Sequence, residues 1–157
     1  RARLAEDAGR FDEAVALYRE TAGLDPGFAR AHAGLARQHW IAASREGLSD
    51  GDRRARLQAA LTHVHRALTE APQLAEALAI QRALLAAGVK PGPEAQTLLP
   101  AGDPATLHER VIELRPSYAA EYYWWGQSLA SEGRTAEASD ALDKARRLDP
   151  VGKVAPP

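Results

Sequence analysis

The first candidates for a metal site in this sequence are its 5 histidines. His63 and His65 are two residues apart, and on a helix this spacing points them about 200° apart, so they cannot share a metal ion. His32 and His39 share one helical face, but they occupy positions expected to pack inside the protein. Cysteine is absent and no carboxylate completes either pair. The sequence therefore predicts no metal site and no cofactor.

Two glycine-containing segments have compositions that could serve cation or phosphate binding. Asp50-Gly51-Asp52 lacks the ligand spacing and the terminal Glu of a calcium loop, so we interpret it as the cap of the helix that follows. Lys90 lies between Gly88 and Gly92 but has neither a following Ser or Thr nor a helix start, as a phosphate loop requires. No nucleophile and base stand at a readable spacing, so we expect a protein that is not an enzyme.

A run of aromatic residues offers a different chemistry, the binding of a partner. Tyr122, Tyr123, Trp124 and Trp125 are consecutive. At about 100° per residue they span roughly 300° of a helix, so they cannot all face one side. Aromatic side chains that stay exposed are common anchors for protein partners. Which of the four stay exposed depends on the elements that position them.

Size, composition and charge exclude several classes of partner. The chain has 157 residues, of which 45% are hydrophobic and 26% charged, as is typical of one globular domain. The formal net charge of -1 gives no general reason for attraction to nucleic acid, so no nucleic-acid partner is expected. No run approaches the ~20 apolar residues needed to cross a bilayer, so membrane insertion is not expected either. The localisation of the protein is not readable from these features.

Four short segments that end in proline divide the chain into similar units. They are Leu24-Asp25-Pro26, Glu70-Ala71-Pro72, Leu114-Arg115-Pro116 and Leu148-Asp149-Pro150, and each closes a stretch with helical character. Proline stops a helix because it lacks an N–H and clashes with the preceding turn. The four prolines are separated by 46, 44 and 34 residues. The chain is therefore expected to consist of helical repeats.

The last repeat resembles the tetratricopeptide family, whose repeat is about 34 residues long. Its matching residues are Tyr122, Trp125, Gly126 and Leu129 of a first helix, Gly133 at the turn, and Ala138, Leu142 and Ala145 of a second helix. The resemblance implies an all-α fold, a right-handed superhelical solenoid of antiparallel helix pairs with about 3.5 repeats. We place the repeats in one domain, residues 1–150, at approximately 1–28 (truncated), 29–74, 75–118 and 119–150. Residues 151–157 are expected to form a linker or tail.

Two of the repeats depart from this pattern. The second and third exceed the family length by 12 and 10 residues, and we place both insertions between paired helices, side by side on one edge of the solenoid. The insertion in the third repeat, residues 88–102, is rich in proline and glycine. In the third repeat Gln81 and Arg82 fall where apolar and small residues are expected, although Asp103 and Pro104 still predict a helix start.

The resemblance also implies a binding site, because the first helices of such repeats line a concave groove where peptides lie. In this register the groove residues are Arg30, Arg37, Trp40, Glu76, Tyr123, Trp124 and Gln127, with Arg3 of the truncated first helix. The sequence therefore predicts a protein or peptide partner, and the arginines would suit an acidic segment or a free carboxylate. Two alternatives stay open: Tyr123 and Trp124 could pack against the third repeat, and the arginines could be solvated or paired with acidic neighbours.

Three further interpretations concern the kind of partner. Ala33, Arg37 and Ala79 stand where chaperone-binding members of the family have Lys and Asn, so chaperone tails are not expected. The chain also resembles, loosely, the repeat regions attached to some bacterial transcription regulators and nucleotide cyclases, which would make it a sensory or regulatory arm. Self-association through Tyr123 and Trp124, or through the truncated first repeat, remains another hypothesis.

Overall fold

The computed structural model describes residues 1–8, 10–90 and 103–150 of the chain. These ranges contain eight α-helices and no β-strand: α1 (Ala2–Asp7), α2 (Phe11–Leu24), α3 (Ala29–Ala43), α4 (Asp50–Glu70), α5 (Ala75–Ala86), α7 (Pro104–Leu114), α8 (Ala119–Ser131) and α9 (Thr135–Leu148). The predicted all-α class is confirmed. Most of the insertion predicted in the third repeat falls on residues 91–102, which are outside the described part. The predicted tail, residues 151–157, is also outside it.

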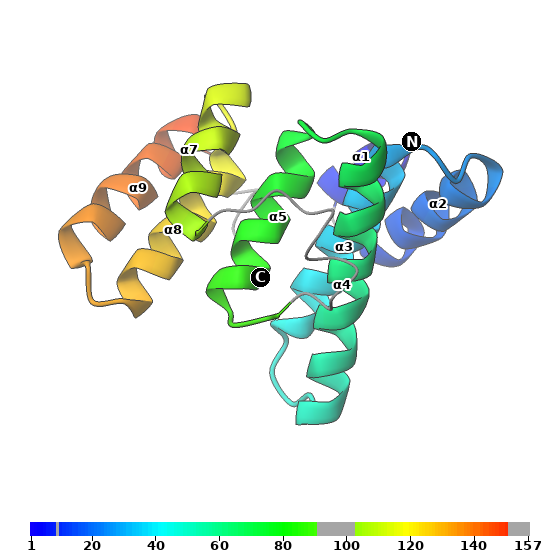
Figure 1. Cartoon of the computed structure of the whole chain (residues 1–157), viewed down its shortest axis with the longest axis horizontal. Coiled ribbons are helices and arrows are strands. Elements are labelled where there is room, and N and C mark those ends of the chain that lie inside the picture. Colours follow the sequence, from blue (N-terminus) through cyan, green and yellow to red (C-terminus); the bar gives the residue numbers. More distant parts are fainter. Residues whose placement is uncertain (9, 91–102, 151–157) are drawn as a thin grey trace.

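The helices form pairs that stack along the long axis of the molecule (Figure 1). Each pair consists of consecutive helices that contact each other: α1 with α2, α3 with α4, α5 with α7, and α8 with α9. Neighbouring pairs are also in contact: α2 meets α3, both α3 and α4 meet α5, and both α5 and α7 meet α8. This arrangement is a helical solenoid, as the repeat pattern predicts. No helix within the described ranges combines the length and the apolar character that crossing a membrane would require.

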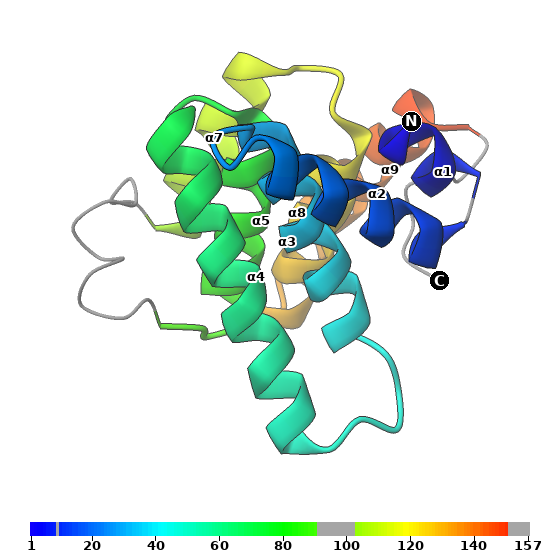
Figure 2. The same cartoon turned by 90° about the vertical axis from the view of Figure 1, so that its right-hand side faces the viewer.

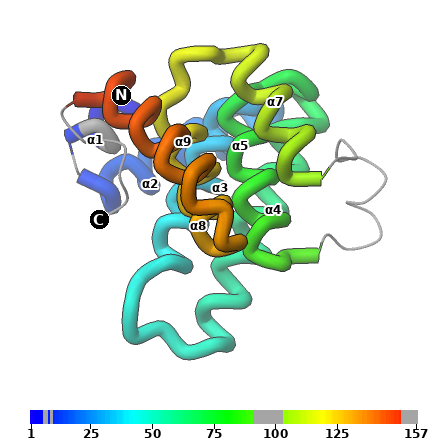
Figure 3. The backbone as a smooth tube through the Cα atoms, turned by 90° about the vertical axis from the view of Figure 1, so that its left-hand side faces the viewer, coloured from blue at the N-terminus to red at the C-terminus, as the bar shows by residue number. Residues whose placement is uncertain are grey.

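The second pair extends past the others at one end. The α3–α4 hairpin projects beyond the remaining helices in two opposite side views (Figure 2 and Figure 3). The projection comes mainly from α4, which has 21 residues where the second helix α9 has 14. Ser49 caps α4, because its hydroxyl accepts a hydrogen bond from the Asp52 N–H. The cap predicted at Asp50-Gly51-Asp52 is thus corrected by one residue, since Ser49 precedes the helix and Asp50 begins it.

Small residues let the helices of a pair approach closely. A Cβ atom on Gly126 would lie 2.8 Å from Leu142 Cγ and 3.2 Å from the Ala138 carbonyl, so only glycine fits there. Between the first and second pairs, a Cβ on Gly34 would lie 2.5 Å from Tyr18 Cε1. The main core continues from α3 through α8, and its α3, α4 and α5 portions are rich in alanine. These close contacts fix how the first helices line up.

The start of α7 follows the prediction from Asp103 and Pro104. Asp103 is the N-cap and accepts hydrogen bonds from the N–H groups of Ala105 and Thr106 at 2.9 and 3.0 Å. Pro104 is the first helical residue, where its missing N–H leaves no donor unsatisfied. These backbone hydrogen bonds lower the pKa of the Asp103 carboxyl and so favour its charged form, which suits a helix start. The predicted helix in the most degenerate repeat is therefore confirmed.

Candidate functional site

The face formed by the first helices α3, α5 and α8 carries two pockets, and we call it the first-helix face. Along α3 and its C-cap Ser44, the pocket-lining residues Arg30, Gly34, Arg37, Ile41 and Ser44 recur every three or four residues. This spacing is that of a single helical face. Both pockets therefore lie on one continuous surface of the stacked first helices. All eight groove residues predicted from the sequence, Arg3 included, line one pocket or the other.

The first pocket, which we call the basic pocket, has a volume of about 720 Å³. It is lined by the N-terminal halves of α3 and α5, the start of α1, two residues of α2, and the segment that joins α7 to α8. Within the described part of the chain, one acidic residue and five basic residues line it: Glu76 with Arg1, Arg3, Arg30, Arg37 and Arg115. Of the predicted site residues, Arg3, Arg30, Arg37 and Glu76 lie here. The pocket thus has an excess of positive charge.

The arginines of the basic pocket differ in their surroundings. Arg30 is exposed and has no ion-pair partner within the described ranges. Arg115 forms an ion pair with Glu76, and its guanidinium lies 4.8 Å from the centre of the Tyr118 ring. Arg37 is half-buried and already takes part in a polar interaction. Arg30 is therefore available to an incoming anion.

Tyr118 provides a buried hydroxyl group at the wall of the basic pocket. Its side chain is 5% exposed, and its hydroxyl has no hydrogen-bond partner among the described residues. Burial raises the pKa of Tyr118 to about 12, so the phenol stays protonated at neutral pH and can donate a hydrogen bond. A buried donor without a partner is unfavourable unless a ligand or water satisfies it. The hydroxyl is thus a second feature of this pocket that suits an anionic oxygen.

The second pocket, which we call the aromatic pocket, has a volume of about 340 Å³. It lies at the other end of the same helices and contains the remaining predicted residues, Trp40, Tyr123, Trp124 and Gln127. Gln127 is exposed, whereas Trp40 and Tyr123 are half-buried and pack against the main core. Small residues of α5, among them Ala83, form another part of the wall.

The sequence leaves open whether Trp124 packs against the third repeat or lines the groove, and in the structure it does both. It is 7% exposed and belongs to the main core, where its ring makes an edge contact with Tyr118 at 6.5 Å between centroids. It also lines the aromatic pocket beside Ala83 and Ala86 of α5. Trp124 is thus a wall of the pocket rather than an exposed anchor. Tyr123 and Gln127 are more exposed to solvent.

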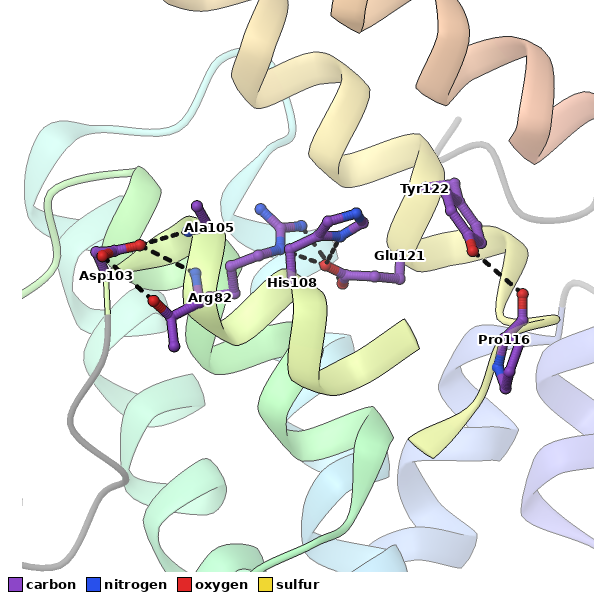
Figure 4. Close-up of polar contacts among 8 residues, drawn as sticks. Arg82, Asp103, Ala105, His108, Pro116, Glu121 and Tyr122 are labelled. Carbon is purple, nitrogen blue, oxygen red and sulfur yellow. Dashed lines mark hydrogen bonds and ion pairs between the residues drawn. The ribbon is translucent and has the colours of Figure 1, made fainter. Parts of the chain in front are cut away.

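A buried ionic cluster behind the aromatic pocket was not predicted from the sequence. Arg82 and Glu121 are both 0% exposed, and Arg82 Nε donates a hydrogen bond to Glu121 Oε1 at 2.5 Å. His108 Nδ1 lies 2.9 Å from the same oxygen, and its ring stacks on Trp125 at 4.7 Å. Figure 4 shows these groups converging from α5, α7 and α8. The sequence contained one indication of this cluster. Arg82 stands at a position where a small packed residue is expected, and a buried arginine requires an anionic partner.

Three histidines also come together, at the packing surface between α3 and α4. His32 Nδ1 lies 3.1 Å from His63 Nδ1, and His39 stacks on His63 with centroids 5.7 Å apart. His32 Nε2 lies 3.0 Å from the Pro26 carbonyl, so it carries the hydrogen and Nδ1 accepts from His63. Burial, followed by the nearby His32 and His39, lowers the pKa of His63 to about 4. Among the described residues, no group of three or more His, Cys, Asp or Glu side chains is arranged to hold a metal ion.

The stacked helix pairs define the class of the protein, an all-α helical-repeat solenoid. Among solved structures, it is similar to YrrB, described as a TPR protein with an unusual peptide-binding site, with 20% identity over 98% of this chain and 85% of that one and a TM-score of 0.47. It is also similar to MamA, with 17% identity over 95% of this chain and 94% of that one and a TM-score of 0.43. No protein-family model and no curated protein matches the sequence.

Proposed function

We propose that this chain is a protein-interaction scaffold that binds an acidic peptide segment, or the free carboxylate of a peptide, in the basic pocket. The observation that carries the proposal is the set of arginines around the buried, unpartnered hydroxyl of Tyr118. Guanidinium groups bind carboxylates through paired hydrogen bonds, and these are strengthened where water is partly excluded. The volume of the pocket falls within the range of ligand-binding sites.

Arg30 and Tyr118 have separate roles in this proposal. Arg30 is exposed at the pocket and supplies charge that attracts the ligand and holds its carboxylate. The Tyr118 hydroxyl gains in the complex the hydrogen bond that it lacks in the free protein. Tyr118→Phe is therefore expected to weaken ligand binding without lowering the stability of the free protein.

The test uses a pool of fluorescein-labelled synthetic octapeptides with a free C-terminal carboxylate, and a matched pool with a C-terminal amide and no acidic residues. Fluorescence polarisation is expected to show binding of the first pool, reduced about fivefold or more by Arg30→Ala or Tyr118→Phe. Arg54→Ala is the control, because Arg54 is exposed on α4 and does not line either pocket. Equal binding of the two pools, or equal effects of Arg30→Ala and Arg54→Ala, would overturn the proposal.

A second candidate function is self-association at the end of the solenoid formed by α1 and α2. Leu4 is 69% exposed and Leu24 is 81% exposed, and large exposed apolar side chains favour association. If this end is an interface, light scattering at several concentrations will show a mass that rises with concentration and falls to the monomer in Leu24→Glu. A mass that stays monomeric at every concentration would remove this candidate.

A further inference from the structure

We infer that one ligand fills both pockets: an extended peptide segment whose acidic group and bulky apolar side chain are four residues apart. The inference rests on the proposed function of the basic pocket. It adds an apolar ligand side chain in the aromatic pocket and the number of residues that separate this side chain from the acidic group. It draws on the relative position of the two pockets, the chemistry of the aromatic pocket and the geometry of an extended chain.

The pockets are adjacent on the first-helix face. Arg37 lines the basic pocket and Trp40 lines the aromatic pocket, and these residues are one turn apart on α3. On α5, Ile80 belongs to the first pocket and Ala83 to the second, again one turn apart. The surface between the pockets therefore consists of consecutive turns of the same helices. A ligand can pass from one pocket to the other along this surface.

The distance between the pockets follows from the helices that line both. On α3, on α5, and from Tyr118 along α8, the residues lining the aromatic pocket follow those lining the basic pocket by about seven to nine residues. At 1.5 Å per residue, the pocket centres are ~10–13 Å apart. The agreement among three parallel helices makes this distance independent of any one side chain.

That distance determines the spacing in an extended ligand. A strand advances about 3.3 Å per residue, so ~10–13 Å corresponds to three or four residues. Side chains alternate between the two sides of an extended chain, so only residues separated by an even number point to the same side. Both groups must point toward the first-helix face. The spacing is therefore four residues rather than three.

The chemistry of the pockets determines which group enters which. The aromatic pocket is bounded by Trp40, Tyr123 and Trp124, which suit an aromatic or branched aliphatic side chain. Its one charged lining residue in the described part of the chain, Arg82, is already neutralised by Glu121. A ligand carboxylate therefore gains little there and more in the basic pocket, beside the exposed Arg30.

The experiment varies the spacing in defined peptides. Each is a fluorescein-labelled peptide in a Gly/Ser host with an amidated C-terminus, one Glu, and one Phe placed between one and eight residues from the Glu. We expect affinity to be highest at a spacing of four and at least about tenfold lower at three and five. A flat profile would overturn the inference, and a maximum at seven or eight would do so by indicating a helical ligand.

Variants on the protein side separate this inference from the proposed function. Gln127→Trp places a bulky group in the aromatic pocket from an exposed position, so the fold should tolerate it. It is expected to remove the preference for Phe at spacing four while leaving carboxylate-dependent binding intact, and Tyr123→Ala should act in the same direction. Arg30→Ala should instead weaken every peptide of the series. If no peptide binds through its carboxylate, the proposed function fails. If carboxylate-dependent binding persists but Gln127→Trp leaves the spacing profile unchanged, only the present inference fails.

Discussion

Removing one partner of the buried Arg82–Glu121 ion pair is expected to destabilise the protein strongly, whereas replacing both should cost much less. The change is Arg82→Met and Glu121→Gln, made singly and together. Both side chains are fully buried, and the pair joins α5 of the third repeat to α8 of the fourth. After either single change, a charge stays in the core without its partner. In the double variant, the amide oxygen introduced by Glu121→Gln can still accept the hydrogen bond of His108.

The magnitude follows from the geometry of the pair. At 2.5 Å between Arg82 Nε and Glu121 Oε1, an effective dielectric constant of ~20 gives an attraction of about 5–7 kcal/mol. Desolvation of the two ions costs several kcal/mol each, so the net contribution of the intact pair is small. A single substitution is expected to lower the free energy of unfolding by about 3–5 kcal/mol, because the remaining ion keeps its desolvation cost. The coupling energy between the two substitutions should be roughly 2–4 kcal/mol.

The four free energies of unfolding of this double-mutant cycle are measured by urea unfolding followed by far-ultraviolet circular dichroism. Tryptophan fluorescence is a second probe that tests whether the transition is two-state. The matched control is the surface pair Arg134 and Glu137, which has two short hydrogen bonds but is exposed to solvent. The same substitutions there should give a coupling close to zero. Single variants at Arg82 and Glu121 that each lose less than about 1 kcal/mol, or a coupling no larger than that of the surface pair, would refute the reasoning.

Three further outcomes are expected. Gly34→Ala should lower the free energy of unfolding by about 1–3 kcal/mol, because the new Cβ would lie 2.5 Å from Tyr18 Cε1; urea unfolding measures this. The pKa of His63 is lowered from 6.5 to about 4, so the unfolded chain binds more protons between these values, and stability should rise with pH across that window. Since His63 is partly exposed, we expect a gain on the order of 1–2 kcal/mol in thermal or urea unfolding. Glu76→Gln should strengthen binding of a carboxylate peptide roughly threefold or more in fluorescence polarisation, because Glu76 no longer competes for Arg115.

Each of these outcomes has its own control. Gly51 is a suitable reference for Gly34, since an added Cβ would come no nearer than 3.7 Å to Ser49 Oγ, and Gly51→Ala should be nearly neutral. His63→Gln should flatten the pH dependence between about 4 and 6.5, and an unchanged slope would assign it to other groups. A weaker complex in Glu76→Gln would mean that the ligand group beside Glu76 is a cation.

The helix pairs could be predicted because their determinants are local in sequence. Proline positions mark the ends of the second helices, and the contact of Gly126 with Leu142 and Ala138 follows from the small and large residues inside one repeat. The same register placed Arg30 and Trp40 on one face of α3, where they line neighbouring pockets. That these residues bind a partner stays a prediction.

The parts that could not be predicted depend on contacts between repeats. Arg82 and Glu121 are 39 residues apart, and of the two only Arg82 departs from the pattern of its own repeat. The stacking of His39 on His63 likewise joins two helices separated by an insertion of unknown geometry. A repeat register assigns faces to residues within one helix, but it gives no distance between side chains of different helices. Partners for buried polar groups therefore had to come from the structure.

The irregular third repeat explains why an aromatic pocket exists at all. On α5 this pocket is lined by the small residues Ala83 and Ala86, so Trp124 of the next repeat fills part of the space beside them and the remainder is open. Arg82 beside them cannot turn toward solvent without breaking its bonds to Glu121, so its charge is held behind the pocket and not within it. The ionic cluster and the alanines thus act together. The cluster fixes the position of α8 against α5, and the alanines leave an apolar space between these two helices that is large enough for a side chain.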